Sequence, residues 1–237
     1  MASTRMIIGV IVASAVLLLL LSMWYQSKVT PQRELNLDSE IELAGPLTPE
    51  EQDVVNPIDT NDMNPHAIIT TNYGVIELEL FTDTMPITTG NFIALAESGF
   101  YDATKFHRVI EGFMVQGGDP NTKGDNEATY GTGGPEKNVP DEFVEGELLT
   151  NKRGTIAMAN SGQPNSGGSQ FFINLVDNTN LDFDKPPLSS KHPVFGRVVN
   201  GMDVIDAIGK VETSGPPRDI PSEPVILESV KIVRNEE

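Results

Sequence analysis

Short runs in which apolar and polar residues alternate make up most of the chain from residue 66 onward. The clearest lies at 75–81, where Ile76, Leu78 and Leu80 alternate with two glutamates, as in a strand with one buried face. Turn-forming residues separate it from further strand-like runs at 67–71, 106–119, 155–160, 169–175, 194–199 and 225–233. This pattern predicts an antiparallel sheet of many short strands.

Two segments carry helix signals instead of strand signals. At 86–98 a proline stands in the first turn, and Gly99 follows as the expected end of the helix. The segment 202–208 is shorter and is followed by Gly209. Many strands with only two helices predict a sheet that closes into a barrel.

The first 25 residues have a different pattern. Residues 6–25 contain no charged residue and would span about 30 Å as a helix, which matches the hydrocarbon thickness of a bilayer. Trp24 and Tyr25 stand at the end of this run, where interfacial aromatic residues occur. A cleaved secretory signal is the alternative, but the run exceeds the usual length of about 7 to 15 apolar residues. We favour an uncleaved membrane anchor over 1–25, with the lipid bilayer as partner of residues 6–25.

The charges around this run give only a weak orientation signal, because Arg5 stands before it and Lys28 and Arg33 stand after it. Only five residues precede the run, which favours a single-pass protein whose larger part lies on the extracytoplasmic side. Residues 26–65 then carry many acidic residues and prolines without sustained periodicity, which is typical of a flexible linker. The apolar positions within 35–43 form either part of this spacer or a short docking element, and we favour the spacer.

Composition narrows the classes of function. The chain has 34 acidic and 16 basic residues and a net charge of −18, which argues against nucleic acid as a partner. It contains no cysteine, which excludes disulfides, thiolate metal ligands and a cysteine nucleophile within it. Its three histidines have no ligand-type spacing, so no metal site and no cofactor are expected. Ser169 lacks the glycine pattern of a nucleophile elbow, so a serine nucleophile is not expected either.

The run FHRVIEGFMVQGGD at 106–119 combines an arginine with aromatic, methionine and glutamine side chains. Strand alternation would place Arg108 and Ile110 on one face and His107 and Val109 on the other. Gly112 is expected to interrupt the run with a bulge or a tight bend, which re-aims Phe113, Met114 and Gln116. A core strand with an arginine that extends to the surface is the alternative interpretation of this segment.

The segment 117–147 is rich in Gly, Pro, Asn and Asp. A loop of this length within a compact domain is usually functional. Its glycine cluster at 131–135 lacks the Gly-Lys-Ser/Thr ending of a phosphate-binding loop, and no strand-helix-strand unit surrounds it. A nucleotide site is therefore not expected here.

Five segments together resemble the cyclophilin family of peptidyl-prolyl cis-trans isomerases. They are FHRVIEGFMVQGGD at 106–119, GTGGP at 131–135, MAN at 158–160, GSQFFI at 168–173 and KHPVFGRV at 191–198. The resemblance implies a closed eight-stranded antiparallel β-barrel capped by two α-helices, with an open outer groove that binds Xaa-Pro peptides. It assigns 66–237 to the isomerase domain, after the anchor at 1–25 and the linker at 26–65.

The resemblance also implies roles for individual residues. Arg108 matches the catalytic arginine of the family. The walls of the proline pocket match Phe113, Met114, Phe172, Leu181 and His192. Polar positions that hold the substrate backbone and support the arginine match Gln116 and Gln170. Asn160 matches the residue whose main chain pairs with the peptide, and Ala159 and Ser161 flank it.

The chain departs from the family pattern in two respects. Many eukaryotic relatives have a tryptophan just before the residue that matches Leu181, where this chain has Asn180, so weak inhibition by cyclosporin is expected. There are also apparent insertions at 120–130 and 183–190, both expected near the groove.

The resulting hypothesis is a monomeric isomerase that assists protein folding at the membrane surface. Its partners would be proline-containing segments of unfolded or folding proteins. A membrane-tethered module that binds proline peptides or acts as a general chaperone, with incidental turnover, is the alternative. The intact Arg108 favours the enzyme, because a pure binding module has no need of it.

Overall fold

The computed structural model describes residues 64–188 and 191–234 of the chain. The predicted anchor at 6–25 and nearly all of the predicted linker lie outside these residues. Within the two described ranges, no helix has the length and apolar character that crossing a membrane requires.

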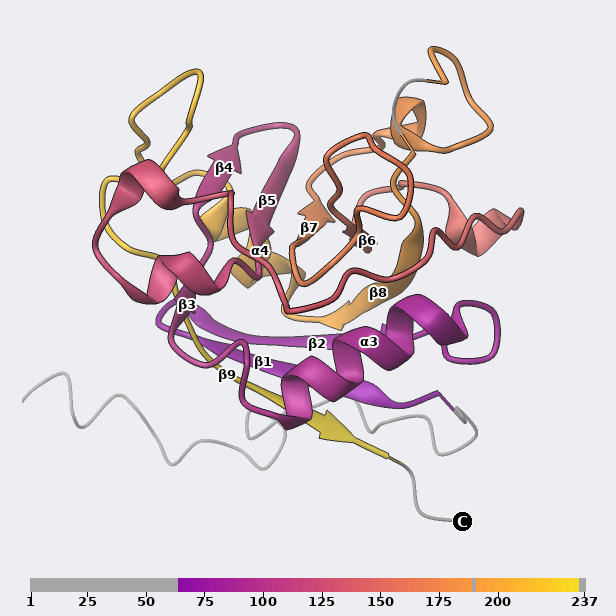
Figure 1. The fold of residues 1–237 in the computed structure, drawn as a ribbon. Coiled ribbons are helices and arrows are strands. Elements are labelled where there is room, and N and C mark those ends of the chain that lie inside the picture. The colour runs from indigo at the N-terminus through magenta and orange to yellow at the C-terminus, as the bar shows by residue number, and fades with distance from the viewer. Residues whose placement is uncertain (1–63, 189–190, 235–237) are drawn as a thin grey trace, which may run out of the picture. The chain divides into compact units, whose positions relative to one another are not determined.

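Nine antiparallel strands form one curved sheet in the order β3-β9-β1-β2-β8-β6-β7-β5-β4 (Figure 1). The alternating patterns account for the long strands, since each buries one set of side chains. The strands are β1 His66–Thr71, β2 Gly74–Leu80, β3 Thr104–Lys105, β4 Arg108–Ile110, β5 Met114–Gly117, β6 Thr155–Met158, β7 Phe171–Asn174, β8 Val194–Asn200 and β9 Ile226–Val233.

The expectation of a closed eight-stranded barrel is wrong, because the sheet has nine strands and stays open between β3 and β4. These two edge strands are consecutive pieces of the segment 104–110. The chain changes partners between them: the Phe106 N–H donates to Val225 O at 2.9 Å, and the His107 N–H donates to Gln116 O at 3.0 Å. One short segment thus serves both ends of the sheet, and no ladder of hydrogen bonds joins those ends.

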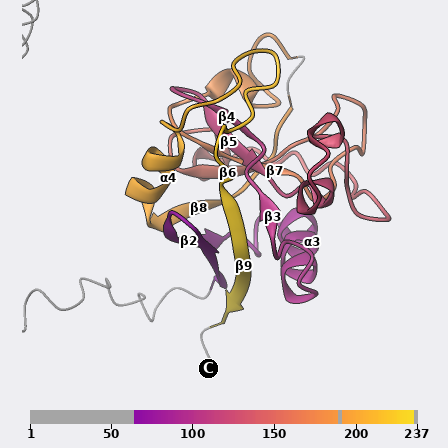
Figure 2. The ribbon, with the colours of Figure 1, turned by 90° about the vertical axis from the view of Figure 1, so that its left-hand side faces the viewer.

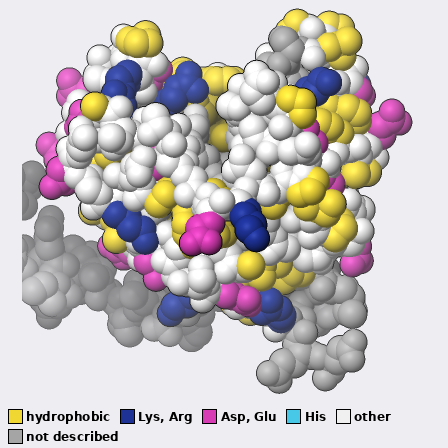
Figure 3. All heavy atoms as spheres, in the orientation of Figure 1, with side chains coloured by type: hydrophobic (Ala, Val, Ile, Leu, Met, Phe, Trp, Pro, Cys, Tyr) yellow, Lys and Arg dark blue, Asp and Glu magenta, His cyan; other side chains and the backbone are white. Residues whose placement is uncertain are grey.

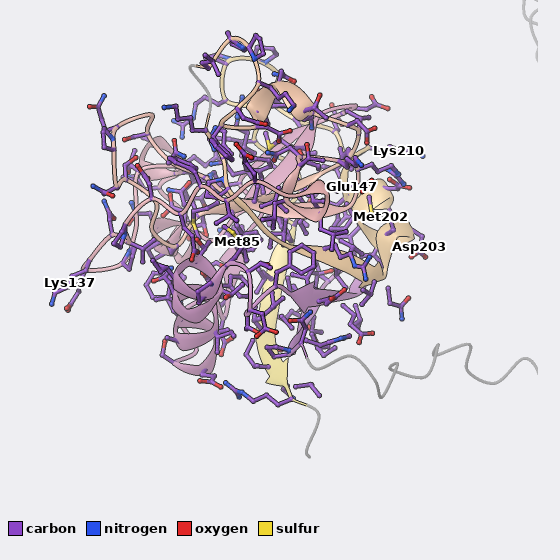
Figure 4. All side chains as sticks on the ribbon, turned by 90° about the vertical axis from the view of Figure 1, so that its right-hand side faces the viewer. Met85, Lys137, Glu147, Met202, Asp203 and Lys210 are labelled. Atoms are coloured by element: carbon purple, nitrogen blue, oxygen red, sulfur yellow. The ribbon has the colours of Figure 1, made fainter. Side chains whose placement is uncertain are left out.

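The two predicted helices are α3 Pro86–Glu97 and α4 Met202–Ile208, and they lie on opposite sides of β9 (Figure 2). Met85, labelled in Figure 4, is in the N-cap position of α3; it provides no side-chain cap and is buried. Glu142 instead accepts hydrogen bonds from the N–H groups of Ile87 and Thr88 at 3.0 and 2.7 Å. A distant carboxylate therefore satisfies the free N–H groups at the start of this helix.

The core lies on the concave side of the sheet. Phe92 of α3 packs there against the rings of Tyr101, Phe171 and Phe195, with centroids 5.1 to 5.6 Å away. This cluster fixes α3 against β7 and β8, because aromatic pairs at such distances contribute to stability beyond their buried area.

Short 3-10 helices interrupt the long loops. They are η1 Pro120–Lys123, η2 Glu127–Thr129, η3 Glu147–Leu149 and η4 Thr179–Leu181. The buried carboxylate of Asp119 closes the loop that carries η1 and η2. It accepts hydrogen bonds from the N–H groups of Asn121, Gly131 and Gly133 at 2.7, 2.5 and 3.2 Å. The apparent insertion at 120–130 is therefore tied at both ends to one side chain.

Candidate active site

Arg108 lies on β4, which is joined to β5 by a tight turn. The Phe113 N–H donates to Ile110 O at 3.0 Å, and Gly112 has a φ of 68°, which favours glycine. The bend predicted at Gly112 is confirmed, but it joins two paired strands of a hairpin. Antiparallel pairing then places Gln116 directly opposite Arg108.

The register extends this pairing into a row across the sheet. Arg108 pairs with Gln116 on β5, and Gln116 pairs with Phe172 on β7. Directly paired residues point to the same face of a sheet, so these three side chains share the outer face. The neighbouring row of Val109, Val115, Ile173 and Ile156 is at most 2 % exposed and points to the core. Strand alternation alone thus separates the site from the core.

Two glutamines hold the polar part of this face in place. Gln116 Nε2 donates to Gln170 Oε1 at 3.0 Å, and Gln170 Nε2 donates to Gly133 O at 2.8 Å. This chain of hydrogen bonds connects the strand opposite Arg108 with the glycine cluster at 131–135. The predicted grouping of Arg108, Gln116 and Gln170 is therefore present in the structure.

The predicted apolar wall is also assembled. The rings of Phe172 and His192 meet edge to face, with centroids 5.3 Å apart. The His192 N–H donates to Leu181 O at 3.0 Å, which places these two residues side by side although ten residues separate them. Met114 precedes Gln116 by two residues and so shares its face, and Phe113 lies in the turn before it. Asn180, which stands before Leu181, is exposed.

A buried polar network that the sequence did not reveal supports this wall. Asn178 Nδ2 donates to Phe113 O at 2.9 Å and to Asn174 Oδ1 at 2.8 Å. Asn151 Nδ2 donates to His192 O at 3.0 Å and to Asp182 Oδ1 at 2.8 Å. The network fixes the backbone on both sides of the apolar wall. Its members are spread over residues 151–182, and single asparagines carry no pattern that would identify them.

Burial determines the protonation of two histidines at the site. It lowers the pKa of His192, whose Nδ1 lies 3.0 Å from Met158 O. It also lowers the pKa of His107, which is buried beneath the loop at Gly131, to about 4. Both imidazoles are therefore neutral at neutral pH, and the wall remains uncharged.

A pocket of about 440 Å³ lies beside the glutamines. Several predicted residues line it together with the glycine cluster at 131–135: Gln116, Ala159, Asn160, Ser161 and Gln170. The Asn160 side chain is engaged by its own chain, since its Nδ2 donates to Lys191 O at 2.7 Å and its Oδ1 accepts from the Gly162 N–H at 3.0 Å. Among the described residues, no hydrogen bond occupies its main-chain N–H or C=O.

Figure 3 shows how charged and hydrophobic side chains are distributed over one face of the molecule. Acidic and basic side chains are scattered over it, and hydrophobic side chains gather toward its right-hand side. Lys137 stands at the outer tip of the loop after the glycine cluster (Figure 4). Within the described ranges, no group of three potential ligands among His, Asp and Glu is placed to hold a metal ion.

Sequence reasoning missed one further group at the site. The Asp219 Oδ2 atom lies 3.8 Å from Arg108 Nε, and its side chain is 11 % exposed. This residue follows Arg108 by more than a hundred positions and belongs to none of the recognised segments. Only the folded structure shows their proximity.

Comparisons with known proteins agree with this geometry. The family model described as "Cyclophilin type peptidyl-prolyl cis-trans isomerase/CLD" matches residues 66–232. The chain is 43 % identical over 171 residues to peptidyl-prolyl cis-trans isomerase A of Dickeya dadantii, covering 71 % of this chain and 85 % of that protein. It is 44 % identical over 167 residues to peptidyl-prolyl cis-trans isomerase B of Escherichia coli, covering 68 % of this chain and 96 % of that protein.

Solved structures show the same likeness. A cyclophilin-type isomerase of Cryptosporidium parvum matches with a TM-score of 0.60 and 30 % identity, over 73 % of this chain and 99 % of that one. A crystal structure of the same protein in the presence of the dipeptide Ala-Pro matches with a TM-score of 0.59 and 31 % identity, over 72 % and 99 % of the two chains.

Proposed function

Since the chain belongs to the cyclophilin-type peptidyl-prolyl cis-trans isomerase family and is an isomerase of this kind, we propose that Arg108 is its catalytic residue. The observation that carries this assignment is the row of Arg108, Gln116 and Phe172 across three paired strands. It places one permanent positive charge at the border between a polar and an apolar surface. Arginine stays protonated at any relevant pH, so this charge does not depend on conditions.

The chemistry of the reaction explains why an arginine is sufficient. Partial double-bond character gives the peptide bond a rotational barrier of about 18–20 kcal/mol. No bond breaks during isomerisation, so neither a nucleophile nor a general base is needed. When the amide twists, its nitrogen becomes pyramidal and gains a lone pair that accepts a hydrogen bond. A donor that binds this twisted form better than the planar form lowers the barrier.

The apolar wall would hold the proline ring of the substrate. The side chains of Met114, Phe172 and Leu181 are 8 % exposed or less, and the neutral His192 ring completes the wall. Exclusion of water from this surface strengthens the hydrogen bond from Arg108, because the effective dielectric falls. The substrate is thus a proline-containing polypeptide segment.

The residues that precede the proline would extend along Asn160. Its main-chain N–H and C=O are available for pairing with an extended peptide, in the way that a strand is added to a sheet edge. The pocket of about 440 Å³ beside Ala159 and Ser161 would then receive a side chain from the amino-terminal part of the substrate. Neither contact requires a cofactor.

Substitution of the arginine tests the catalytic assignment. In a cis-trans isomerisation assay on an Xaa-Pro peptide, we expect Arg108→Ala to lower kcat/KM on the order of 100-fold, which is about 2.7 kcal/mol of transition-state stabilisation. Arg234→Ala is the matched control, because Arg234 is a surface arginine paired with Glu97 at 2.6 Å. Equal rates in Arg108→Ala and the parent protein would reject the assignment.

We further propose that the domain acts as a monomer at a membrane surface, held there by residues 6–25, and assists the folding of exported or surface proteins. The uncharged run of twenty residues and its aromatic end support this proposal. Protease added to intact cells should remove a tag at residue 237 but not a tag before residue 1. Protection of the carboxyl-terminal tag would place the domain in the cytoplasm and reject the proposed orientation.

A further inference from the structure

The loop 212–222 covers the free edge of β4. It folds back on itself, since the Ser214 N–H donates to Ile220 O and the Ser222 N–H donates to Glu212 O, both at 2.8 Å. Its far end then contacts the edge strand, where the Val109 N–H donates to Asp219 O at 2.9 Å. Asp219 is therefore held by its main chain directly beside the strand that carries Arg108.

The conformation of Asp219 is unusual for a residue other than glycine. Its φ is 52°, in the left-handed region that aspartate and asparagine tolerate better than most residues. Its N–H donates to Gly215 O at 3.0 Å, which closes the tip of the loop. This backbone geometry aims the side chain inward, and the carboxylate ends 3.8 Å from Arg108 Nε.

Among the described residues, the Asp219 carboxylate has a single basic partner. Arg108 is the only basic side chain among them whose nitrogen lies within 4 Å of the Asp219 carboxylate. The neighbouring Arg218 turns the other way, and its guanidinium donates to the main-chain oxygens of Glu127 and Tyr130. Arg218 thus fastens the tip of the loop to the apparent insertion at 120–130, while Asp219 faces the site.

We propose that Asp219 is a positioning residue for the catalytic Arg108. This inference rests on the proposed function, because it presupposes that Arg108 acts on the substrate. The carboxylate lies on the Nε side of the guanidinium, and no hydrogen bond within the described ranges occupies either Nη group, so both can donate to the substrate. An arginine side chain has several rotatable bonds, and a fixed negative charge at Nε restricts them before the substrate arrives.

The first test is Asp219→Asn in the full chain. Asparagine has the same shape and also tolerates a positive φ, so the loop keeps its backbone and only the charge is lost. We expect kcat for an Xaa-Pro peptide to fall about tenfold. KM should stay within twofold of the parent value, because the apolar wall and Asn160 are unchanged. Glu223→Gln is the matched control: it removes an equal charge from an exposed position four residues further along, and should leave kcat unchanged.

The second test combines both substitutions. In an Arg108→Ala background, Asp219→Asn should have no further effect on kcat, since the group that it positions is gone. An equal loss in both backgrounds would show that Asp219 acts through the fold and would overturn the inference. Parental kcat in Asp219→Asn would overturn it as well. If Arg108→Ala itself retained the parental rate, the proposed function would fail instead, so the two failures are distinguishable.

Discussion

At the scale of single residues, burial determines the charge of the site. His107 and Arg108 are neighbours in sequence, but His107 is buried beneath the loop at Gly131, whereas Arg108 lies on the outer face of β4. The pKa of His107 is lowered to about 4 by its loss of solvent, and Asp119 opposes this shift only in part. At neutral pH His107 is therefore uncharged, and no second positive charge adjoins Arg108 on its amino-terminal side.

This burial predicts a dependence of stability on pH. Above pH 6.5 His107 is neutral in both the folded and the unfolded chain, so it adds nothing to the pH dependence of the free energy of unfolding. Between pH 6.5 and about 4 only the unfolded chain binds the proton, so the free energy of unfolding falls with the pH, by about 3 kcal/mol at most. Urea unfolding at pH 7 and at pH 5 measures the effect, with His107→Gln as the control. The His107→Gln variant should lose less stability than the parent protein, and equal losses would contradict the prediction.

The turn at Gly112 has room for a side chain but a backbone conformation that favours glycine. A Cβ atom at Gly112 would meet no heavy atom within 4 Å, so only its φ of 68° opposes a side chain there. Gly112→Val should therefore strain the turn, by about 1–2 kcal/mol, and lower activity more than stability. The reason is that this turn sets the register that places Gln116 opposite Arg108.

Gly112→Asn is the matched variant, because asparagine tolerates a positive φ. It should retain most of the activity, while Gly112→Val should lose about tenfold in kcat/KM at a temperature where both remain folded. Denaturant unfolding and the isomerisation assay on the same samples separate the two effects. An activity loss that the unfolded fraction alone accounts for would refute the prediction.

Sequence and structure agree at the residue scale where a residue lies inside a contiguous motif. Arg108, Gln116 and Phe172 lie in such segments, and the sheet register brings them together as expected. Asp219 and Asn178 could not be predicted, because each is a single polar residue whose partner is distant in sequence. Their contacts arise from loop paths, which depend on the whole fold rather than on local propensity.

At the scale of elements, the loop with η4 supports the hairpin of β4 and β5. Asn178 is 6 % exposed, and its side chain joins this loop to the carbonyl of Phe113, in the turn just before β5. A hydrogen bond between two elements thus helps to hold the apolar wall, in addition to the contacts that the wall residues make themselves.

Removal of the Asn178 amide should affect both stability and substrate binding. Asn178→Ala removes the donor to the buried Asn174 Oδ1 and one of the two donors to the Phe113 oxygen, which keeps the Leu175 N–H at 2.9 Å. It should lower the free energy of unfolding by about 2 kcal/mol. It should also raise KM for an Xaa-Pro peptide, because the loop with η4 loses its side-chain hydrogen bond to the Phe113 carbonyl. Asn180→Ala, two residues further along and exposed, is the control and should change stability by less than about 0.5 kcal/mol. Unchanged KM together with lowered stability would confine Asn178 to a structural role.

The lengths of the strands explain why the prediction of a closed barrel was wrong. The alternating pattern identifies the long strands β1, β2 and β9 well, because each has six or more residues with one buried face. β3 and β4 have two and three residues, which is too short for a period of two to be recognised. The pattern therefore gives the strands and their faces, but not where the sheet stays open.

At the scale of the whole molecule, the main feature is the negative charge. The chain carries −18, and the excess of acidic residues continues through the isomerase domain. Such a field does not alter the twisting of an amide, but it changes the local concentration of charged substrates. The preference of the enzyme for positively charged peptides should therefore depend in part on ionic strength, and this part should not require contacts with the groove.

Two peptides with the same Xaa-Pro centre, one flanked by lysines and one by glutamates, test this last prediction. At about 10 mM ionic strength the Debye length is about 30 Å, so the field of the domain reaches the flanking charges, and kcat/KM should be several-fold higher for the lysine peptide. At about 1 M the Debye length falls to about 3 Å and the two values should converge. Exchange measurements by NMR avoid a coupled protease whose own rate varies with salt. A preference that persists at 1 M would instead indicate a direct contact between the groove and a flanking residue, and the long-range account would then be wrong.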